Sequence, residues 1–241
     1  MPRKFGQHFL RDQSILERIA EAACPDGEHE TVVEIGPGRG ALTRHLLPRA
    51  KNIIAIEVDP AMVDHLKSFF GNEEELEVRH ENVLETNLKQ FAPCVIAGNL
   101  PYYISTPIAS HVFEAAGAWK RAVFLVQKEV ALRMAAPHGR RDYGYLSVMI
   151  QVHAEAKVLF HVPPSAFSPP PKVDSSVILL EPKPFDKADA TRFLKFASRA
   201  FAHKRKTLRN NLAPFYGKVA LDAQPEAGLR AEQLSPAALH D

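Results

Sequence analysis

Short apolar runs alternate with segments of helical periodicity along the first three quarters of the chain. Most runs are five residues long and rich in Val, Ile, Leu and Phe, which is typical of strands buried on both faces. Seven strands are predicted, at residues 31–35, 52–56, 76–80, 94–98, 122–126, 156–160 and 176–180. Strands that alternate with helices indicate an α/β fold around a mostly parallel sheet.

Helical spacing of apolar residues predicts helices between these strands, and a basic helical segment follows the last strand. The predicted helices cover residues 15–23, 42–47, 60–66, 106–116, 128–135, 145–152, 188–202 and 205–212. Two prolines, Pro182 and Pro184, separate the two patterns, because proline interrupts strands and helices. We therefore expect one domain over residues 1–180, in which residues 1–11 form a flexible segment, and a small helical domain over residues 181–241.

A glycine-rich loop, Gly36-Pro37-Gly38-Arg39-Gly40, joins the first strand to a helix. This order opens nucleotide-binding α/β folds, because glycines let the backbone approach a ligand and a helix N-terminus offers free N–H groups. The spacing G-x-G-x-G differs from the G-x-G-x-x-G of dinucleotide sites, which argues against a dehydrogenase. A tight turn that binds no ligand is the alternative.

Polar side chains follow the second and third strands. Glu57 lies about 20 residues past the glycine loop, where a carboxylate binds a ribose diol. Asn82 stands where the third strand ends, beside the place of an adenine pocket. Because the carboxyl ends of parallel strands meet at one edge of a sheet, these residues predict a single ligand site.

The fourth strand runs into Asn99-Leu100-Pro101-Tyr102. Pro101 lacks an N–H and keeps Leu100 out of the helical region, so the Leu100 carbonyl stays free. An amide, a free carbonyl and an aromatic ring suit a planar base with an exocyclic amine. A rigid strand-to-helix turn with a packed Tyr102 is the competing interpretation.

A stiff, proline-rich loop over residues 162–174 carries Phe167. A phenylalanine held on such a loop is either a hydrophobic plug or a second ring for the base. The sequence leaves both open.

Composition narrows the class of protein. The 241 residues are 46% hydrophobic and 24% charged, as in ordinary soluble proteins. No apolar run approaches the roughly 18 residues of a membrane span, and the charged N-terminus lacks a signal peptide's apolar stretch. The only cysteines are Cys24 and Cys94, which argues against disulfides and zinc. We expect a cytoplasmic protein without a metal site.

Positive charge is concentrated in the last quarter of the chain. From Glu181 onward, 11 Lys or Arg stand against 7 Asp or Glu, whereas the rest of the chain has 19 against 21. The densest patch is His203-Lys204-Arg205-Lys206. On a helix it would form a basic face that contacts phosphates, although a solvated helix has the same composition.

Eight sequence blocks then carry a resemblance to a known family. They are GQHFLRD (6–12), VVEIGPGRGALT (32–43), IEVDP (56–60), GNLPYYIST (98–106), QKEVALRM (127–134), DYGYLSV (142–148), FSPPPKVDS (167–175) and FAHKRKTLRNNL (201–212). In this order they resemble the ribosomal RNA adenine dimethyltransferase family of the KsgA/RsmA type. GNLPYY with the downstream F-x-P-x-P-K-V-D-S pattern is the most specific part.

The resemblance implies a Rossmann-like class I methyltransferase that uses S-adenosyl-L-methionine and releases S-adenosyl-L-homocysteine. It implies a seven-stranded sheet with a small α-helical C-terminal domain, and dimethylation of two adjacent adenosines near the 3′ end of 16S small-subunit rRNA. The family's cofactor roles fall on His8, Leu10, Gly36, Gly38, Glu57, Asn82 and Asn99. The family often has Asn at His8 and Asp at Asn82, and its tail after Leu212 is usually longer.

The implied chemistry needs orientation more than a base. Asn99 and the Leu100 carbonyl would accept the two hydrogens of the adenine amine, and Pro101 would keep that carbonyl free. Tyr102 would stack on one face of the extruded base and Phe167 on the other.

RNA contacts are expected at Arg140, Arg141 and Lys172, with Arg3 and Lys4, around the mouth of the site, and at Lys204, Arg205 and Lys206 in the C-terminal domain. The implied partner is 16S rRNA in a pre-30S subunit, bound by a monomer without DNA or membrane. Two alternatives stay open. One is a large-subunit rRNA methyltransferase of the macrolide-resistance type, and the other is a ribosome-assembly factor with little catalysis.

Overall fold

The computed structural model describes residues 8–25, 29–184 and 186–240. The chain forms two compact units, of which unit 1 is Met1–Ala131 with Lys157–Pro182, and unit 2 is Leu132–Ala156 with Lys183–Asp241. The chain passes from unit 1 to unit 2 twice, and the second passage lies between Pro182 and Lys183. Residues 132–156 differ from the expectation, since they belong to the helical unit. Their buried Tyr143 and Val148 share an apolar cluster with Phe193 and Leu212.

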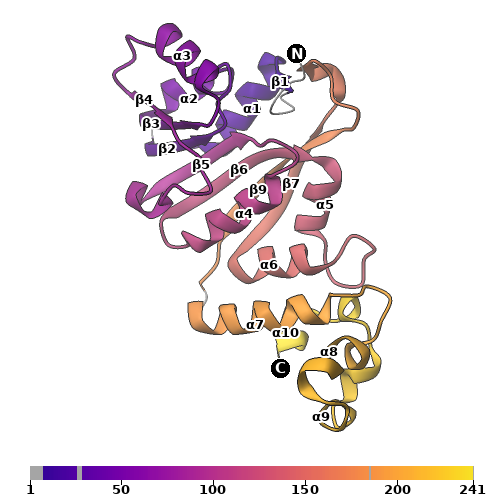
Figure 1. Cartoon of the computed structure of the whole chain (residues 1–241). Helices are drawn as coiled ribbons and strands as arrows, with labels where there is room; N and C mark the ends of the chain where they lie inside the picture. Colours follow the sequence, from indigo (N-terminus) through magenta and orange to yellow (C-terminus); the bar gives the residue numbers. More distant parts are fainter. Residues whose placement is uncertain (1–7, 26–28, 185, 241) are drawn as a thin grey trace. The chain divides into compact units, whose positions relative to one another are not determined.

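A seven-stranded sheet forms the centre of unit 1 (Figure 1). Its strands are β2 (His29–Ile35), β3 (Ala50–Glu57), β4 (Leu76–His80), β5 (Cys94–Asn99), β6 (Trp119–Gln127), β7 (Ala154–Val162) and β9 (Ser175–Pro182). They lie in the order β4-β3-β2-β5-β6-β9-β7. The pairs from β4 to β6 are parallel, and β9 is antiparallel to β6. The predicted α/β class and the predicted strands are confirmed.

Helices and short 3₁₀ turns connect the strands of unit 1. They are α1 (Gln13–Ala23), α2 (Thr43–Leu46), η1 (Leu47–Arg49), α3 (Pro60–Phe69), η2 (Leu88–Phe91), α4 (Ser105–Glu114) and η3 (Pro164–Ala166). Helix α5 (Lys128–Ala135) begins in unit 1 and ends in unit 2. The Asp12 carboxylate caps α1, and Asp59 followed by Pro60 starts α3, as the favoured N-cap and N1 residues do. The apolar face of α1, with Leu16 and Ile19, is buried in the core beside β5 and β6.

A second, two-stranded sheet brings the N-terminal segment to the proline-rich loop. In it β1 (Phe9–Leu10) pairs antiparallel with β8 (Phe167–Ser168). The Arg11 N–H also donates to the Ala166 carbonyl, at 2.8 Å. Residues 8–11 are therefore tied to a loop more than 150 positions further along the chain.

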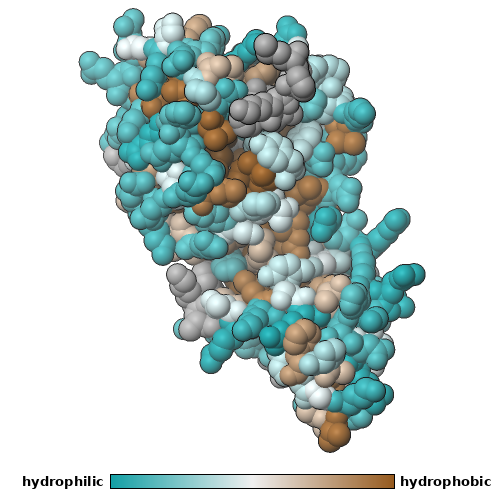
Figure 2. Space-filling model, in the orientation of Figure 1, coloured by the Kyte–Doolittle hydropathy of each residue, from teal (hydrophilic) through white to brown (hydrophobic). Residues whose placement is uncertain are grey.

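Unit 2 is helical. It contains α6 (Tyr145–His153), α7 (Lys187–Ala200), α8 (Leu208–Tyr216), α9 (Lys218–Asp222), η4 (Pro225–Gly228), η5 (Ala231–Gln233) and α10 (Pro236–His240). The prediction of a helix from residue 205 was wrong at its start, because the Thr207 side chain caps α8. Residues 203–206 form a turn instead of a basic helix face. Much of the visible surface of this unit is hydrophilic (Figure 2). Among the described residues, no helix combines the length and apolar character needed to cross a membrane.

Candidate active site

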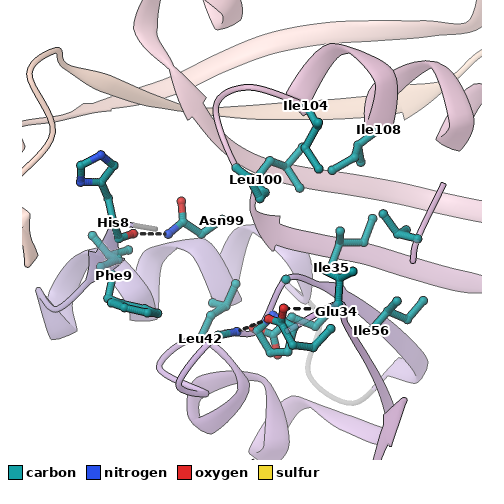
Figure 3. A pocket seen from close by; sticks show the side chains of 18 of the residues that line it. His8, Phe9, Glu34, Ile35, Leu42, Ile56, Asn99, Leu100, Ile104 and Ile108 are labelled. Atoms are coloured by element: carbon teal, nitrogen blue, oxygen red, sulfur yellow. Dashed lines mark hydrogen bonds between the residues drawn. The ribbon is translucent and has the colours of Figure 1, made fainter. Parts of the chain in front are cut away.

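A cavity lies at the carboxyl ends of β2, β3, β4 and β5, with β1 beside it (Figure 3). This is the edge at which open parallel sheets bind ligands. All seven residues expected to contact a cofactor line it, and so do three of the residues of the strand-to-helix turn. They are His8, Leu10, Gly36, Gly38, Glu57, Asn82 and Asn99, and then Leu100, Pro101 and Tyr102.

The glycine loop uses its glycines in two ways. Gly36 and Gly38 line the cavity with φ angles of +67° and +57°, which side chains disfavour. Gly40, with φ +77°, serves packing instead, because a Cβ there would lie 2.4 Å from the Phe70 ring. The third glycine of G-x-G-x-G therefore lets the loop pack against the end of α3.

Glu57 ties the glycine loop to the start of α3. Its Oε2 accepts the Gly38 N–H at 3.0 Å, and its Oε1 accepts the N–H groups of Val58 and Asp59, each at 2.9 Å. A carboxylate offers about four lone-pair sites, so three are used and one remains on Oε2. The buried carboxylate can accept one further hydroxyl from a ligand in the cavity.

Glu34 is a second buried carboxyl at the cavity, which the sequence analysis did not single out. It is 1% exposed, and the Thr43 hydroxyl donates to its Oε2 at 2.6 Å. Burial raises the pKa of Glu34 to about 7, although the Thr43 hydrogen bond lowers it, and the nearby Glu57 charge raises it further. One carboxyl of the pair thus keeps its proton up to near-neutral pH.

Asn82 is held by its own turn. Its Oδ1 accepts the Leu84 N–H at 3.1 Å, and its Nδ2 donates to Glu85 Oε1 at 2.8 Å. These two bonds fix which end of the amide is the oxygen, and that oxygen retains a second lone pair. Glu85 is therefore a positioning residue that the sequence pattern did not reveal.

The turn after β5 has the expected backbone. The Pro101 carbonyl accepts the Ile104 N–H at 3.1 Å, and α4 begins only at Ser105. The Leu100 carbonyl therefore stays outside the helical hydrogen-bond ladder. The Asn99 Nδ2 donates to the His8 carbonyl at 3.1 Å, as Figure 3 shows, so Oδ1 is the acceptor end.

Tyr102 is held at both ends of its side chain. Its hydroxyl lies 2.6 Å from the Ser175 Oγ, and burial raises the pKa of Tyr102. The His8 imidazole stacks on its ring, with centroids 5.8 Å apart and an interplanar angle of 26°. Ser175 is the last residue of the FSPPPKVDS block, and its part in holding Tyr102 was not expected.

The expectation that Phe167 stacks on the base is wrong for this structure. Phe167 is 4% exposed and packs in the core with Leu10 and Val162. The β1–β8 pairing sets Leu10 opposite Phe167 and directs the ring into that apolar cluster. Of the two roles left open for Phe167, the hydrophobic plug is the one observed.

The basic residues fall into two groups. In unit 2, the Lys204 Nζ donates to the Arg141 carbonyl at 2.5 Å, which joins the turn 203–206 to the loop that carries Arg140. The buried Asn211 holds this turn, because its Nδ2 donates to the carbonyls of Ala200 and His203. Lys172 belongs to unit 1. Arg3 and Lys4 lie outside the described residues.

Glu34→Gln tests the buried acid. In the unfolded chain Glu34 titrates near 4.5, and in the folded protein near 7, so the folded state binds more protons between these pH values. The free energy of unfolding then falls as pH rises through this window, by roughly 3 kcal/mol in all. We expect the neutral Gln variant to lose this fall in urea denaturation at pH 5 and pH 8.

The matched control is Glu21→Gln, at an exposed carboxyl on α1. It should keep the pH dependence of the unchanged protein. If Glu34→Gln also kept it, Glu34 would not be the group that titrates.

Comparison with known proteins places the chain in a family. The sequence model described as ribosomal RNA adenine dimethylase matches residues 1–234. The ribosomal RNA small subunit methyltransferase A of Legionella pneumophila is 40% identical over 242 residues, covering 98% of this chain and 94% of the relative. A dimethyladenosine transferase structure from Plasmodium falciparum has a TM-score of 0.80 and 26% sequence identity, and the match covers 96% of this chain and 94% of that chain. The structure of the 23S rRNA methyltransferase ErmE has a TM-score of 0.74 and 27% sequence identity, and the match covers 96% of this chain and 98% of that chain. The chain belongs to the ribosomal RNA adenine dimethylase family.

Proposed function

We propose that this protein is an S-adenosyl-L-methionine-dependent enzyme that dimethylates the 6-amino groups of two adjacent adenosines near the 3′ end of 16S rRNA. One observation carries the proposal. The glycine loop, Glu57 and the Asn99–Tyr102 turn line a single cavity in a chain of the adenine dimethylase family. The relatives named as small-subunit methyltransferases support the choice of rRNA.

The cavity fits the cofactor in its donor set. Gly36 and Gly38 give the backbone room, the Glu57 Oε2 has a lone pair for a ribose hydroxyl, and the Asn82 oxygen has one for an adenine amine. Apolar side chains such as Ile35 and Ile56 form the walls between these polar groups (Figure 3). When bound, S-adenosyl-L-methionine supplies an activated methyl on a sulfonium.

The protein's own part in the reaction is to hold the amine of the target adenine. That amine is a poor nucleophile because its lone pair is conjugated with the ring. Acceptance of its two hydrogens by Asn99 Oδ1 and the Leu100 carbonyl favours a pyramidal nitrogen with its lone pair free. The Asn99 amide is already oriented by its bond to the His8 carbonyl, so little reorganisation is needed when the base arrives.

The basic residues of unit 2 supply a phosphate-binding surface for the RNA. The Lys204–Arg141 bond brings two basic segments together that are 63 positions apart. Neighbouring cations on a fixed backbone suit the folded phosphate backbone of an rRNA hairpin. We propose that the enzyme acts as a monomer on a pre-30S subunit in the cytoplasm.

A large-subunit substrate is the second candidate, and the similarity to the ErmE structure favours it over other classes. The test supplies tritiated S-adenosyl-L-methionine with undermethylated small subunits, large subunits or free rRNA, and maps the labelled base. Label on two adjacent adenosines of the small subunit is expected. Label on the large subunit alone would reject the small-subunit substrate and favour the second candidate. Tight small-subunit binding without label would indicate an assembly factor.

Asn99→Ala should lower the rate of methyl transfer by at least about 100-fold, because one preorganised acceptor of the reacting amine is lost. Cofactor affinity, measured by calorimetry, should largely survive, since the glycine loop and Glu57 remain. Asn72→Ala, at an exposed position outside the cavity, is the control and should keep full activity. Near-normal dimethylation by Asn99→Ala would contradict the proposed role of Asn99 in holding the adenine amine.

The basic turn can be tested through salt. Replacing Arg205 and Lys206 by Ala should weaken RNA binding and reduce the slope of log K against log salt by roughly 1.5, because two phosphate contacts are lost. Filter binding over a series of KCl concentrations measures the slope. The control replaces Lys67 and Lys120, two exposed lysines of unit 1. Equal salt slopes in the two double variants would show that the turn 203–206 does not belong to the RNA interface.

A further inference from the structure

The side chain of His8 and its backbone are held by different parts of the site. Its backbone carbonyl accepts from Asn99, and its ring lies over Tyr102. In Figure 3 the imidazole points away from Leu42 and Glu34, which lie deeper in the cavity. The ring therefore belongs to the side of the site where the target base is expected.

One hydrogen bond fixes the ring in this place. The His8 Nδ1 is 2.9 Å from the Pro169 carbonyl. A carbonyl can only accept, so Nδ1 carries the hydrogen. Pro169 follows β8, which pairs with β1 directly after His8. Ring and backbone are thus both attached to the proline-rich loop.

The space over Tyr102 is too small for three layers. Carbon atoms in contact lie about 3.5–4.0 Å apart, so a base between two rings would hold those rings roughly 7–8 Å apart. The His8 and Tyr102 centroids are 5.8 Å apart. A base that stacks on this face of Tyr102 must therefore take the place of the imidazole.

We propose that the His8 ring is a placeholder on Tyr102 that weakens the binding of every base by the cost of its displacement, so that a base without contacts elsewhere on the protein binds poorly. The inference rests on the proposed function, because it assigns the base to Tyr102. To enter, a base breaks one stacking contact and the His8–Pro169 hydrogen bond. An adenosine in RNA offsets this cost through phosphate contacts elsewhere on the protein, whereas a free adenine nucleoside has none. His8 acts on the base through competition and is not itself a catalytic residue.

The test measures base binding without turnover. Quenching of 2-aminopurine riboside fluorescence, with S-adenosyl-L-homocysteine present, reports stacking of a free purine. His8→Ala should bind the riboside about tenfold more tightly, because the base no longer displaces a stacked and hydrogen-bonded ring. His8→Asn, which removes the ring but keeps a polar side chain, should show the same gain. Adding Tyr102→Ala should abolish the gain.

A matched control is available on α3. The His65 imidazole stacks on Phe69 with centroids 6.0 Å apart and an angle of 20°, but neither residue lines the cavity. His65→Ala should leave riboside binding unchanged. Affinity for S-adenosyl-L-homocysteine, measured separately, shows whether the cavity is intact in each variant.

Two outcomes overturn the proposal. Riboside binding that is unchanged in both His8 variants would show that the ring does not compete with the base. Weaker binding would show that the ring contacts the bound base and helps to hold it. Methylation of small subunits by the unchanged protein is measured in a separate experiment. Its absence would reject the proposed function, while a gain in riboside binding would still support the placeholder.

Discussion

The cavity depends on the three hydrogen bonds that backbone N–H groups donate to one buried carboxylate. Glu57 stands at the end of β3 and accepts from Gly38 in one loop and from Val58 and Asp59 in the next. Both loops lie at the carboxyl edge of the sheet, where backbone N–H groups have no strand partner. Glu57 satisfies these groups and fixes the distance between the loops. The glycine loop therefore keeps its shape before any ligand is bound.

A second constraint comes from the N-terminal strand. His8 bonds through its carbonyl to Asn99 and through its ring to the Pro169 carbonyl, which lies 161 positions away in the sequence. The β1–β8 pairing and the burial of Phe167 belong to the same arrangement. Three segments that are remote in sequence thus meet around Asn99 and Tyr102. The orientation of the Asn99 amide is a property of this junction and not of the Asn-Leu-Pro-Tyr turn alone.

Sequence reasoning reached the strands and their ends because these depend on local pattern. Apolar runs predict the strands, and the glycine or polar residues at or just past their ends predict Gly36, Glu57, Asn82 and Asn99, which share one edge of the sheet. Sequence reasoning failed where the pairing of segments that are remote in the sequence decides which way a side chain points. The side on which Phe167 points depends on its register with Leu10, and no periodicity encodes that register. A cap at Thr207 likewise turned an expected basic helix face into a turn.

Two buried carboxyls, Glu34 and Glu57, line the cavity and differ in their surroundings. Glu34 and Glu57 are both nearly inaccessible to water, and like charges at low dielectric repel strongly. Burial first, and the Glu57 charge in addition, raise the pKa of Glu34 to about 7. Below that pH Glu34 is neutral, whereas the Glu57 carboxylate is held by three N–H donors. A cavity in which the Glu57 carboxylate and the Asn82 and Asn99 amides stand among apolar side chains favours a ligand that carries hydroxyl and amino groups on a largely apolar frame, and a nucleoside is such a ligand.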